Sequence, residues 1–508
     1  MDQTAPSPLL SRILPVALAT GMATAALLAT TPAGAQMVAL DEGVAIGDFT
    51  FFPSLQVRIR GEYRRHPVDV GGAVYERSAV QAVGFESAAP TVMRTDEPVY
   101  DQWQLSERTR LGIRVEHDVV VGVFSLQDAR VLGVLPGAPD AIDAGGFGSF
   151  GPHEAYVDVR TDVDDPALRV RVGRQELLWG DGRLVGWSDW SPRGASLDAA
   201  WLKLDFGDVT FELLGSMLAP PSPIAPDYVS HERQTATDAA GQPLDAEGTG
   251  AQLYGLNAGW RIIPLFNVEL VGLARVAREP LPMELTRGDT YTLDGRFHGQ
   301  ERGVSYAVEG AYQLGRVASY GENLDVSAFA FAGRVAWQTA LPWDFRFAAE
   351  GGYASGDDAE RGADGTVASG TTFERFDPIV PETHEHFGQM DLLAWSNAIE
   401  AGGEVSAKPD EELLMALGYS FLGLADPADR WTTGTLAAVG AAPDNASSII
   451  GHEVDARLEY RPLDAVAFTG GYGLCVLGDG GKAVLNAAGR GDRDMLHYGY
   501  LQAELKAP

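Results

Sequence analysis

The sequence has little cysteine and few basic residues, and each shortage excludes a class of protein. Cys475 is the single cysteine among 508 residues, which excludes an internal disulfide and a cysteine-based zinc site. We interpret it as a small apolar strand residue rather than a reactive thiol. Lys and Arg number 38 against 70 Asp and Glu, for a formal net charge of −32. Such a balance excludes binding to nucleic acid through a general basic field.

Long apolar runs are also missing. After residue 36 there is no stretch of about 18–20 apolar residues, the length that a membrane-spanning helix needs. The N-terminus has a shorter apolar run behind Arg12, followed by Ala33-Gly34-Ala35. This pattern predicts a secretory signal peptide over residues 1–35, cleaved before Gln36, with an uncleaved membrane anchor as the weaker alternative. The exported chain is then soluble or an outer-membrane barrel.

What the chain does have is alternation of apolar and polar residues, which is the signal of a β-strand. Residues 55–60 place Leu, Val and Ile on one face and Gln, Arg and Arg on the other, and residues 168–172 and 454–460 repeat the pattern. These runs are about 9–13 residues long. Strands of soluble domains are typically about 5–6 residues, whereas tilted transmembrane strands need roughly 9–11. The lengths favour a membrane barrel.

The connections between the runs differ in length. Short turns join 199–206 to 208–218 and 450–461 to 464–476. Long polar segments separate other runs, at 66–100, 219–250, 278–302, 355–390 and 423–449. Aromatic residues lie near predicted strand ends, as interfacial girdles require: Tyr63, Trp179, Trp187, Trp190, Trp260, Trp343, Tyr353, Tyr419 and Tyr460. We therefore predict an all-β fold over 36–508, a transmembrane antiparallel barrel of roughly 16–18 strands with short periplasmic turns and long extracellular loops. Soluble β-sandwiches or a β-helix are the alternative.

The charged residues of these runs are expected to face the lumen, because an Arg or Lys on the lipid side costs about 2–4 kcal/mol at mid-membrane. The early strands carry an arginine-rich set: Arg58, Arg60, Arg64, Arg65, Arg108, Arg110, Arg114, Arg169, Arg171, Arg174 and Arg183. An inward strip of this kind would guide anionic solutes. The alternative is that the arginines only neutralise buried carboxylates at Glu62, Glu116, Glu154, Asp158 and Glu176. Both can hold at once.

Residues 171–190 read RVGRQELLWGDGRLVGWSDW, and residues 373–392 contain a His-Phe-Gly-Gln-Met-Asp-Leu segment. These two blocks resemble two sequence blocks of the alginate export family of outer-membrane barrels. The resemblance implies an eighteen-stranded, monomeric porin that passes an anionic polymer through a charged constriction. It carries over Arg174, Glu176, Asp181 and Arg183, with Asp189 as a further candidate. The predicted pore-lining residues are therefore Arg58, Arg60, Arg110, Arg171, Arg174, Glu176, Asp181 and Arg183. Because Arg174 shares its phase with Val170 and Val172, an inward Arg174 requires a bulge or a strand end near Gly173.

Other chemical signals are weak. His384 and His386 supply two metal ligands at most, so a loop role is preferred. The run at Asp357, Asp358 and Glu360 is interpreted as a solvated acidic loop rather than a calcium site. No carboxylate pair or nucleophile stands out by its spacing, so we expect no enzyme, with an exported polysaccharide hydrolase as the alternative.

The sequence thus predicts an outer-membrane porin without a cofactor, giving passive passage to an anionic sugar or exopolysaccharide such as alginate. A general diffusion porin for small solutes is the first alternative, and a soluble exported polysaccharide-binding protein is the second. The expected partners are outer-membrane lipid and the solute, with periplasmic export machinery left open and no nucleic acid.

Overall fold

The computed structural model describes residues 43–68, 101–132, 149–162, 167–219, 251–277, 287–319, 322–357, 372–382, 384–436 and 438–507. The predicted signal peptide lies outside the described residues, as do Asp358 and Glu360 of the acidic run. No helix in the described part of the chain is long and apolar enough to cross a membrane.

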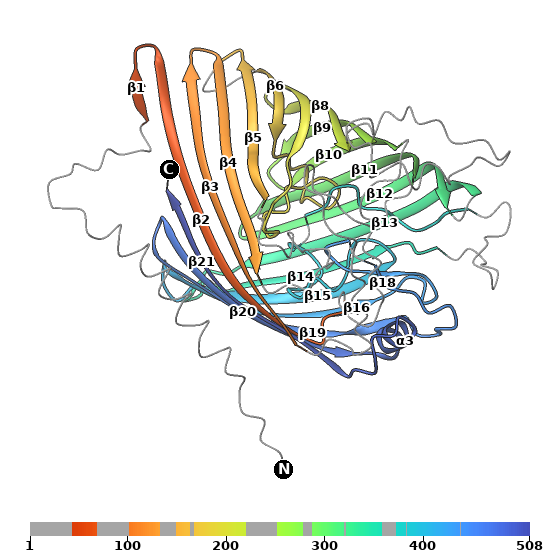
Figure 1. Ribbon diagram of the computed structural model, residues 1–508. Coiled ribbons are helices and arrows are strands. Elements are labelled where there is room, and N and C mark those ends of the chain that lie inside the picture. Colours follow the sequence, from red (N-terminus) through yellow and green to blue (C-terminus); the bar gives the residue numbers. More distant parts are fainter. Residues whose placement is uncertain are drawn as a thin grey trace, which may run out of the picture.

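Eighteen antiparallel strands form one closed ring (Figure 1). They are β2 (Phe49–Arg65), β3 (Asp101–His117), β4 (Val120–Leu132), β5 (Ser149–Arg160), β6 (Leu168–Gln175), β7 (Leu197–Asp205), β8 (Val209–Ala219), β9 (Ala251–Ile263), β10 (Phe266–Ala277), β11 (Arg287–Glu301), β12 (Val304–Ser319), β13 (Glu322–Gln338), β14 (Arg346–Ala354), β15 (Ala398–Ala407), β16 (Leu413–Gly423), β19 (Ile449–Leu463), β20 (Val466–Leu477) and β21 (Met495–Ala507). The ring closes between β21 and β2, where Leu55 lies opposite Ala507 and Arg65 opposite His497. Closure leaves no strand edge without a hydrogen-bonding partner, which a membrane requires.

Among the described residues, three small strands and one helix lie outside the ring. The short β1 (Val44–Ile46) pairs with the start of β2. In the connection between β16 and β19, β17 (Trp431–Thr432) pairs with β18 (Ala438–Gly440). The helix α3 (Asp479–Ala487) lies between β20 and β21.

The connections confirm the predicted asymmetry. β7 and β8 pair across a tight turn, as do β19 and β20, so both predicted hairpins are correct. The prediction of a loop over 278–302 is wrong for most of its length, because β11 occupies Arg287–Glu301. Its polar residues misled the prediction, since Thr292 is buried inside the barrel while Leu293 is exposed outside. Polar residues suit a strand whose inner face borders the lumen.

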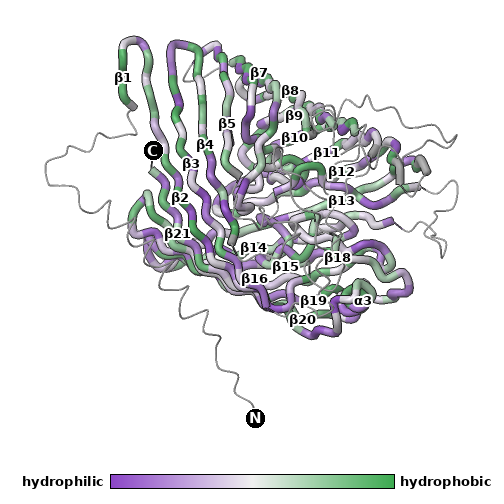
Figure 2. The backbone as a smooth tube through the Cα atoms, viewed as in Figure 1, coloured by the Kyte–Doolittle hydropathy of each residue, from purple (hydrophilic) through white to green (hydrophobic). Residues whose placement is uncertain are grey.

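The two faces of the strands differ as a membrane barrel demands. Leu111, Leu213, Leu293 and Leu417 are each at least half exposed on the outer face, whereas Arg108 on the inner face is buried. Figure 2 shows hydrophobic and hydrophilic residues alternating along β2 to β5. An outer band of this kind is too apolar for water and suits lipid. The soluble sandwich and the β-helix are therefore rejected.

Three connections fold into the ring and fill part of its lumen, namely residues 176–196, 372–382 with 384–397, and 424–436 with 438–448 (Figure 1). Val185 of the first segment pairs with Val380 of the second, and Phe373 pairs with Val326 of the wall. Buried apolar residues of these segments pack against the wall of β7 to β16: Trp179, Val185, Phe376, Leu393 and Trp431 contact the cluster that holds Leu214, Leu273, Ala330, Ala398 and Leu422. The inserted segments are thus held by a hydrophobic core, which the sequence left open.

The inserted segments show that part of the predicted aromatic girdle is wrong. Trp179 is 5% exposed and belongs to the core inside the barrel. Trp190 is also inside, against arginine and histidine side chains. Trp260 and Trp343 are more than half exposed on the outside, as predicted. A tryptophan near a strand end in the sequence can therefore lie either at the membrane interface or at the start of a loop inserted into the barrel.

Candidate functional site: the inner wall of the barrel

The inner face of β2 and β3 carries four arginines, Arg58, Arg60, Arg108 and Arg110, which we call the ladder. Arg58 lies directly opposite Arg108 in the pairing of the two strands. Residues two apart on a strand point to the same face, so Arg60 and Arg110 follow on the same side. All four of these arginines point inward, whereas Arg65 of β2 has the opposite phase and is exposed.

The inserted segment 176–196 covers the ladder. Arg58 donates hydrogen bonds to the main-chain carbonyls of Asp189 at 2.7 Å, of Trp190 at 3.2 Å and of Ser191 at 3.0 Å. Arg108 donates to the Asp189 carbonyl at 3.1 Å and to its carboxylate at 2.7 Å. Arg58 is 4% exposed and Arg108 is 1% exposed. The ladder therefore faces the lumen but holds the chain itself.

Arg60 completes this attachment. Its guanidinium donates to the Glu62 carboxylate at 2.6 Å and to the Trp190 carbonyl at 2.9 Å, and lies 3.8 Å from the centre of the Trp190 ring. His384 stacks on the same ring with centroids 3.7 Å apart. A guanidinium against an aromatic face is favourable, more so when both are desolvated. Trp190 is thus fixed in place inside the barrel.

Asp189 lies among three cations of the ladder. Its carboxylate is 2.7 Å from Arg108, 3.6 Å from Arg58 and 3.7 Å from Arg110. Burial alone would raise the pKa of this carboxyl, but the charges of Arg108 and Arg58 and the hydrogen bond from Arg108 lower it below its ordinary value. Asp189 is therefore ionised at neutral pH and neutralises part of the ladder.

Glu176, a predicted site residue, joins the ladder to β5. Its carboxylate is 3.3 Å from Arg110 and 2.7 Å from the His153 ring. Arg110 also donates to Gln127 at 2.7 Å. Arg110 and Glu176 both face the lumen, Arg110 from β3 and Glu176 from the start of the inserted segment.

Asp181 and Arg183 bind the inserted segment to the opposite wall. Asp181 accepts a hydrogen bond from Arg296, which also donates to Glu269 at 2.8 Å. Arg183 is 6% exposed and lies 3.9 Å from Glu309 of β12. Its guanidinium lies over the Phe387 and Trp395 rings. These two residues are inside the barrel but serve packing, and the prediction that Arg183 lines an open pore is not supported.

Arg171 belongs to a second basic group, on β5 and β6. The buried Asp158 carboxylate accepts from Arg169 at 2.6 Å, from Arg171 at 3.0 Å and from Arg160 at 3.4 Å. We call these four residues the mouth cluster, because they lie beside the short connection between β5 and β6. By the rule that short turns of such barrels face the periplasm, this is the periplasmic mouth.

Arg174 is the one predicted site residue on the wrong face. It forms a two-pronged ion pair with Asp198 of β7, at 2.8 and 2.7 Å, and both side chains are well exposed. β6 pairs with both neighbours without a register shift, so no bulge turns Arg174 inward. It keeps the phase of the outward Val172. The placement of Arg174 in the lumen was therefore wrong, because the strand keeps its parity to its end.

Four of the five predicted neutralising carboxylates form ion pairs, and Glu154 is the exception among the described residues. Glu62 pairs with Arg60, Glu116 with Arg114, Glu176 with Arg110, and Asp158 with three arginines. The wall of β10 to β19 differs, because its buried or half-buried carboxylates, among them Glu269, Asp294, Glu309, Glu400, Glu453 and Asp455, outnumber its arginines, which include Arg275, Arg296, Arg334 and Arg457. The lumen thus has a basic side and an acidic side.

The two histidines of the second block are used within the protein. The His384 ring lies 2.8 Å from the Asp391 carboxylate, and the His386 ring lies 3.0 Å from the Asp181 carbonyl. Burial and the charge of Arg183 lower the pKa of His386 well below its ordinary value, so it is neutral. In the described part of the chain no group of three or more His, Cys, Asp or Glu is placed to hold a metal ion. Asp357 of the acidic run is buried and accepts from the backbone N–H of Glu374.

The sequence of this chain matches the family described as alginate export over residues 85–491. Among curated proteins no significant match is found. Among solved structures, the barrel is similar to Acinetobacter baumannii OccAB1, with 11% identity, a TM-score of 0.51, and coverage of 91% of this chain and 97% of that one. Acinetobacter baumannii OccAB2 is similar at 8% identity and a TM-score of 0.51, with 90% of this chain and 98% of that one covered. At such identities the likeness concerns the fold.

Proposed function

Because this chain belongs to the alginate export family and forms an outer-membrane channel, we propose that it gives passive passage to an anionic sugar or exopolysaccharide such as alginate. Family and fold are those of outer-membrane channels rather than of enzymes. The solute is the part of this statement that we infer.

The observation that carries the proposal is the concentration of arginine on the inner wall of β2 to β6. The ladder and the mouth cluster together place seven guanidinium groups on this wall. Arg presents several donors in a planar fork that matches a carboxylate, and it stays charged at any physiological pH. A wall of this composition favours a carboxylate-bearing solute over a neutral one.

The covered ladder fits the same proposal. Asp189 and the carbonyls beside it satisfy the guanidinium groups when the inserted segment is seated. A solute carboxylate offers the same kind of acceptor oxygen as Asp189. If a solute carboxylate replaced Asp189, the arginines would keep a partner while the solute passed along the ladder. This matters because leaving a buried charge unpaired is costly.

Flux into proteoliposomes tests the proposal. We expect trigalacturonate to enter vesicles that contain the channel faster than maltotriose, a neutral sugar of similar size. Arg110→Gln should reduce this preference, since Arg110 contacts both Glu176 and Asp189. Arg174→Gln on the outer face is the matched control and should leave it unchanged. Equal flux of the two sugars through the unaltered channel would contradict the proposal.

A general diffusion porin for small solutes is the second candidate. The acidic wall of β10 to β19 favours it, because a lumen with charges of both signs does not select strongly for anions. In that case small neutral sugars and small cations would enter the vesicles as fast as galacturonate.

A further inference from the structure

The mouth cluster has more positive charge than its own carboxylate can balance. Three guanidinium groups, those of Arg160, Arg169 and Arg171, share one oxygen of Asp158. The cluster therefore has two positive charges in excess. Lys203 lies opposite Arg169 in the pairing of β6 with β7 and adds a further basic residue, itself opposite Glu212.

Two guanidinium N–H groups of this cluster have no acceptor among the described residues. The Nε atoms of Arg160 and Arg169 are buried without a hydrogen-bond partner in the described part of the chain. A buried donor without an acceptor is costly and is rare in native proteins. No carbonyl of an inserted segment reaches these arginines among the described residues, in contrast to the ladder. The side chains remain 15–24% exposed, so a solute can reach them.

Aromatic rings orient two of the three arginines. The Arg171 guanidinium lies 4.2 Å from the centre of the Tyr156 ring and 5.3 Å from that of Trp201. Arg169 lies 5.4 Å from the Trp201 ring, which is fixed by a hydrogen bond from its Nε1 to Glu212 at 2.9 Å. A guanidinium that stacks on a ring keeps its N–H groups at its edge free for a ligand. The geometry is therefore set before any ligand arrives.

We infer that Arg160, Arg169 and Arg171 form a carboxylate-binding site at the periplasmic mouth, which takes a sugar acid before it passes into the constricted part of the barrel. The inference rests on the proposed function and adds the place of first contact. The carboxylate of one uronic acid unit accepts from N–H groups on the exposed part of these side chains, while Asp158 keeps the three side chains together. The chemistry recognised is a planar carboxylate rather than negative charge alone.

Block of single-channel current in a planar bilayer tests this site. Trigalacturonate is added to one side at a time, with maltotriose as the neutral comparison. We expect block at lower concentration from the periplasmic side. The variants Arg169→Lys and Arg171→Lys keep the charge and remove the fork, so they should weaken the block from that side about tenfold, the loss expected for one charge-assisted hydrogen bond.

The matched control is an arginine that lies at the same mouth but does not belong to the mouth cluster. Arg114 of β3 faces the lumen near the same end and pairs with Glu116. Arg114→Lys should leave the block unchanged, and heat-modifiable gel mobility should show that all three variants are folded. Block that is equal from the two sides, equal for maltotriose, or insensitive to the Arg169 and Arg171 variants would overturn the inferred site.

The two proposals fail in different ways. An unaltered channel that transports neutral and acidic sugars alike, yet is blocked by trigalacturonate in an Arg171-dependent manner, would overturn the proposed function and support the site. An acid-selective channel whose block ignores the mouth cluster would do the reverse.

Discussion

The ladder and the mouth cluster use the same residue type on the same inner wall, but their partners differ. The ladder is bound by main-chain carbonyls and by Asp189 of an inserted segment, which leaves Arg58 and Arg108 almost completely buried. The mouth cluster is bound by a single wall carboxylate and stays partly exposed. Inward direction therefore does not by itself leave an arginine open to a solute. Coverage by an inserted segment decides how much of its side chain is exposed.

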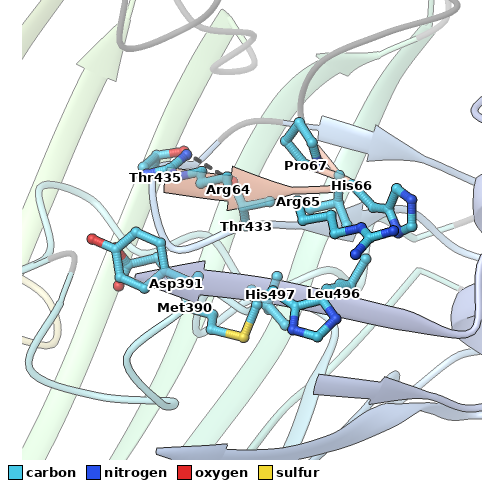
Figure 3. Close-up of a pocket in the computed structure, with 13 residues that line it drawn as sticks. Arg64, Arg65, His66, Pro67, Met390, Asp391, Thr433, Thr435, Leu496 and His497 are labelled. Carbon is cyan, nitrogen blue, oxygen red and sulfur yellow. Dashed lines mark hydrogen bonds between the residues drawn. The ribbon is translucent and has the colours of Figure 1, made fainter. Parts of the chain in front are cut away.

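The pocket in Figure 3 shows that inserted segments also cover wall residues at the opposite mouth of the barrel. Arg64, Arg65 and His66 of the β2 end lie beside Met390 and Asp391 of an inserted segment, and Thr433 and Thr435 of another close the pocket. Strand ends and inserted segments together shape this end of the barrel, where the wall alone would leave it open.

The largest expected effect comes from breaking the ladder at Arg60. Arg60→Met leaves the fully buried Glu62 with only the longer contact to Arg64, at 3.4 Å. Loss of one partner of a buried ion pair costs about 3–5 kcal/mol. Arg171→Met should cost clearly less, because Asp158 keeps Arg160 and Arg169. Urea unfolding in detergent, followed by gel mobility, measures both; equal destabilisation would remove the distinction between the two regions.

Much of this fold could be predicted from the sequence, because the alternation of neighbouring residues along each strand contains the information. Alternation with period two shows which face of a strand meets lipid, and it held even at Arg174, whose phase with Val172 correctly indicated the outer face. The family match placed Arg174 inside, and the parity of the strand was the better guide. β11 was missed because its inner face is polar throughout its centre.

The inserted segments could not be predicted in the same way. The bonds that hold 188–191 on the ladder are made to main-chain carbonyls, which every residue has. Only Trp190 and Asp189 carry a side-chain signal, and a tryptophan at a loop start is also typical of a membrane girdle. Recognising the insertion needs the distance between the loop and the wall, which no local pattern contains.

The next largest effect is expected at Asp189. Asp189→Asn removes the negative charge between Arg58, Arg108 and Arg110, and weakens hydrogen bonds to charged groups worth about 1.5–3 kcal/mol each. The ladder should then become more accessible to anions, with higher single-channel conductance and stronger anion preference. Asp198→Asn on the outer face is the control. Unchanged conductance in Asp189→Asn would indicate that the ladder does not border the path.

Proton concentration should affect the inserted segments through Glu382. Burial and the neighbouring Glu385 charge raise the pKa of Glu382 to about 7. The folded state thus binds this proton more tightly than the unfolded one, so the contribution to stability is complete below about pH 4.5 and is lost as the pH rises through about 7.

We therefore expect more frequent current fluctuations at pH 8 than at pH 5, as the contact of Glu382 with the segment around Gly182 weakens. Asp189 behaves oppositely, because its lowered pKa makes its contribution disappear only as the pH falls below its ordinary range. Glu382→Gln should show the quiet behaviour at both pH values. A pH dependence that persists in this variant would assign the effect to another group.

The smallest effect is expected at Arg174. Arg174→Gln breaks an exposed ion pair on the outer face, and exposed pairs contribute about 0–1 kcal/mol. Ion selectivity should not change at all, whereas removal of a lumen arginine such as Arg110 should lower anion preference. A shift in selectivity for Arg174→Gln as large as that for Arg110→Gln would indicate that the assignment of inner and outer faces in β6 is incorrect.

The reversal potential of the unaltered channel in a potassium chloride gradient tests the central claim most directly. If the arginines of β2 to β6 border the solute path, the potential has the sign of a channel that prefers chloride, and it moves toward zero in Arg110→Gln and in Arg169→Gln. A channel that prefers potassium, with a potential that neither change affects, would show that the acidic wall of β10 to β19 governs passage instead.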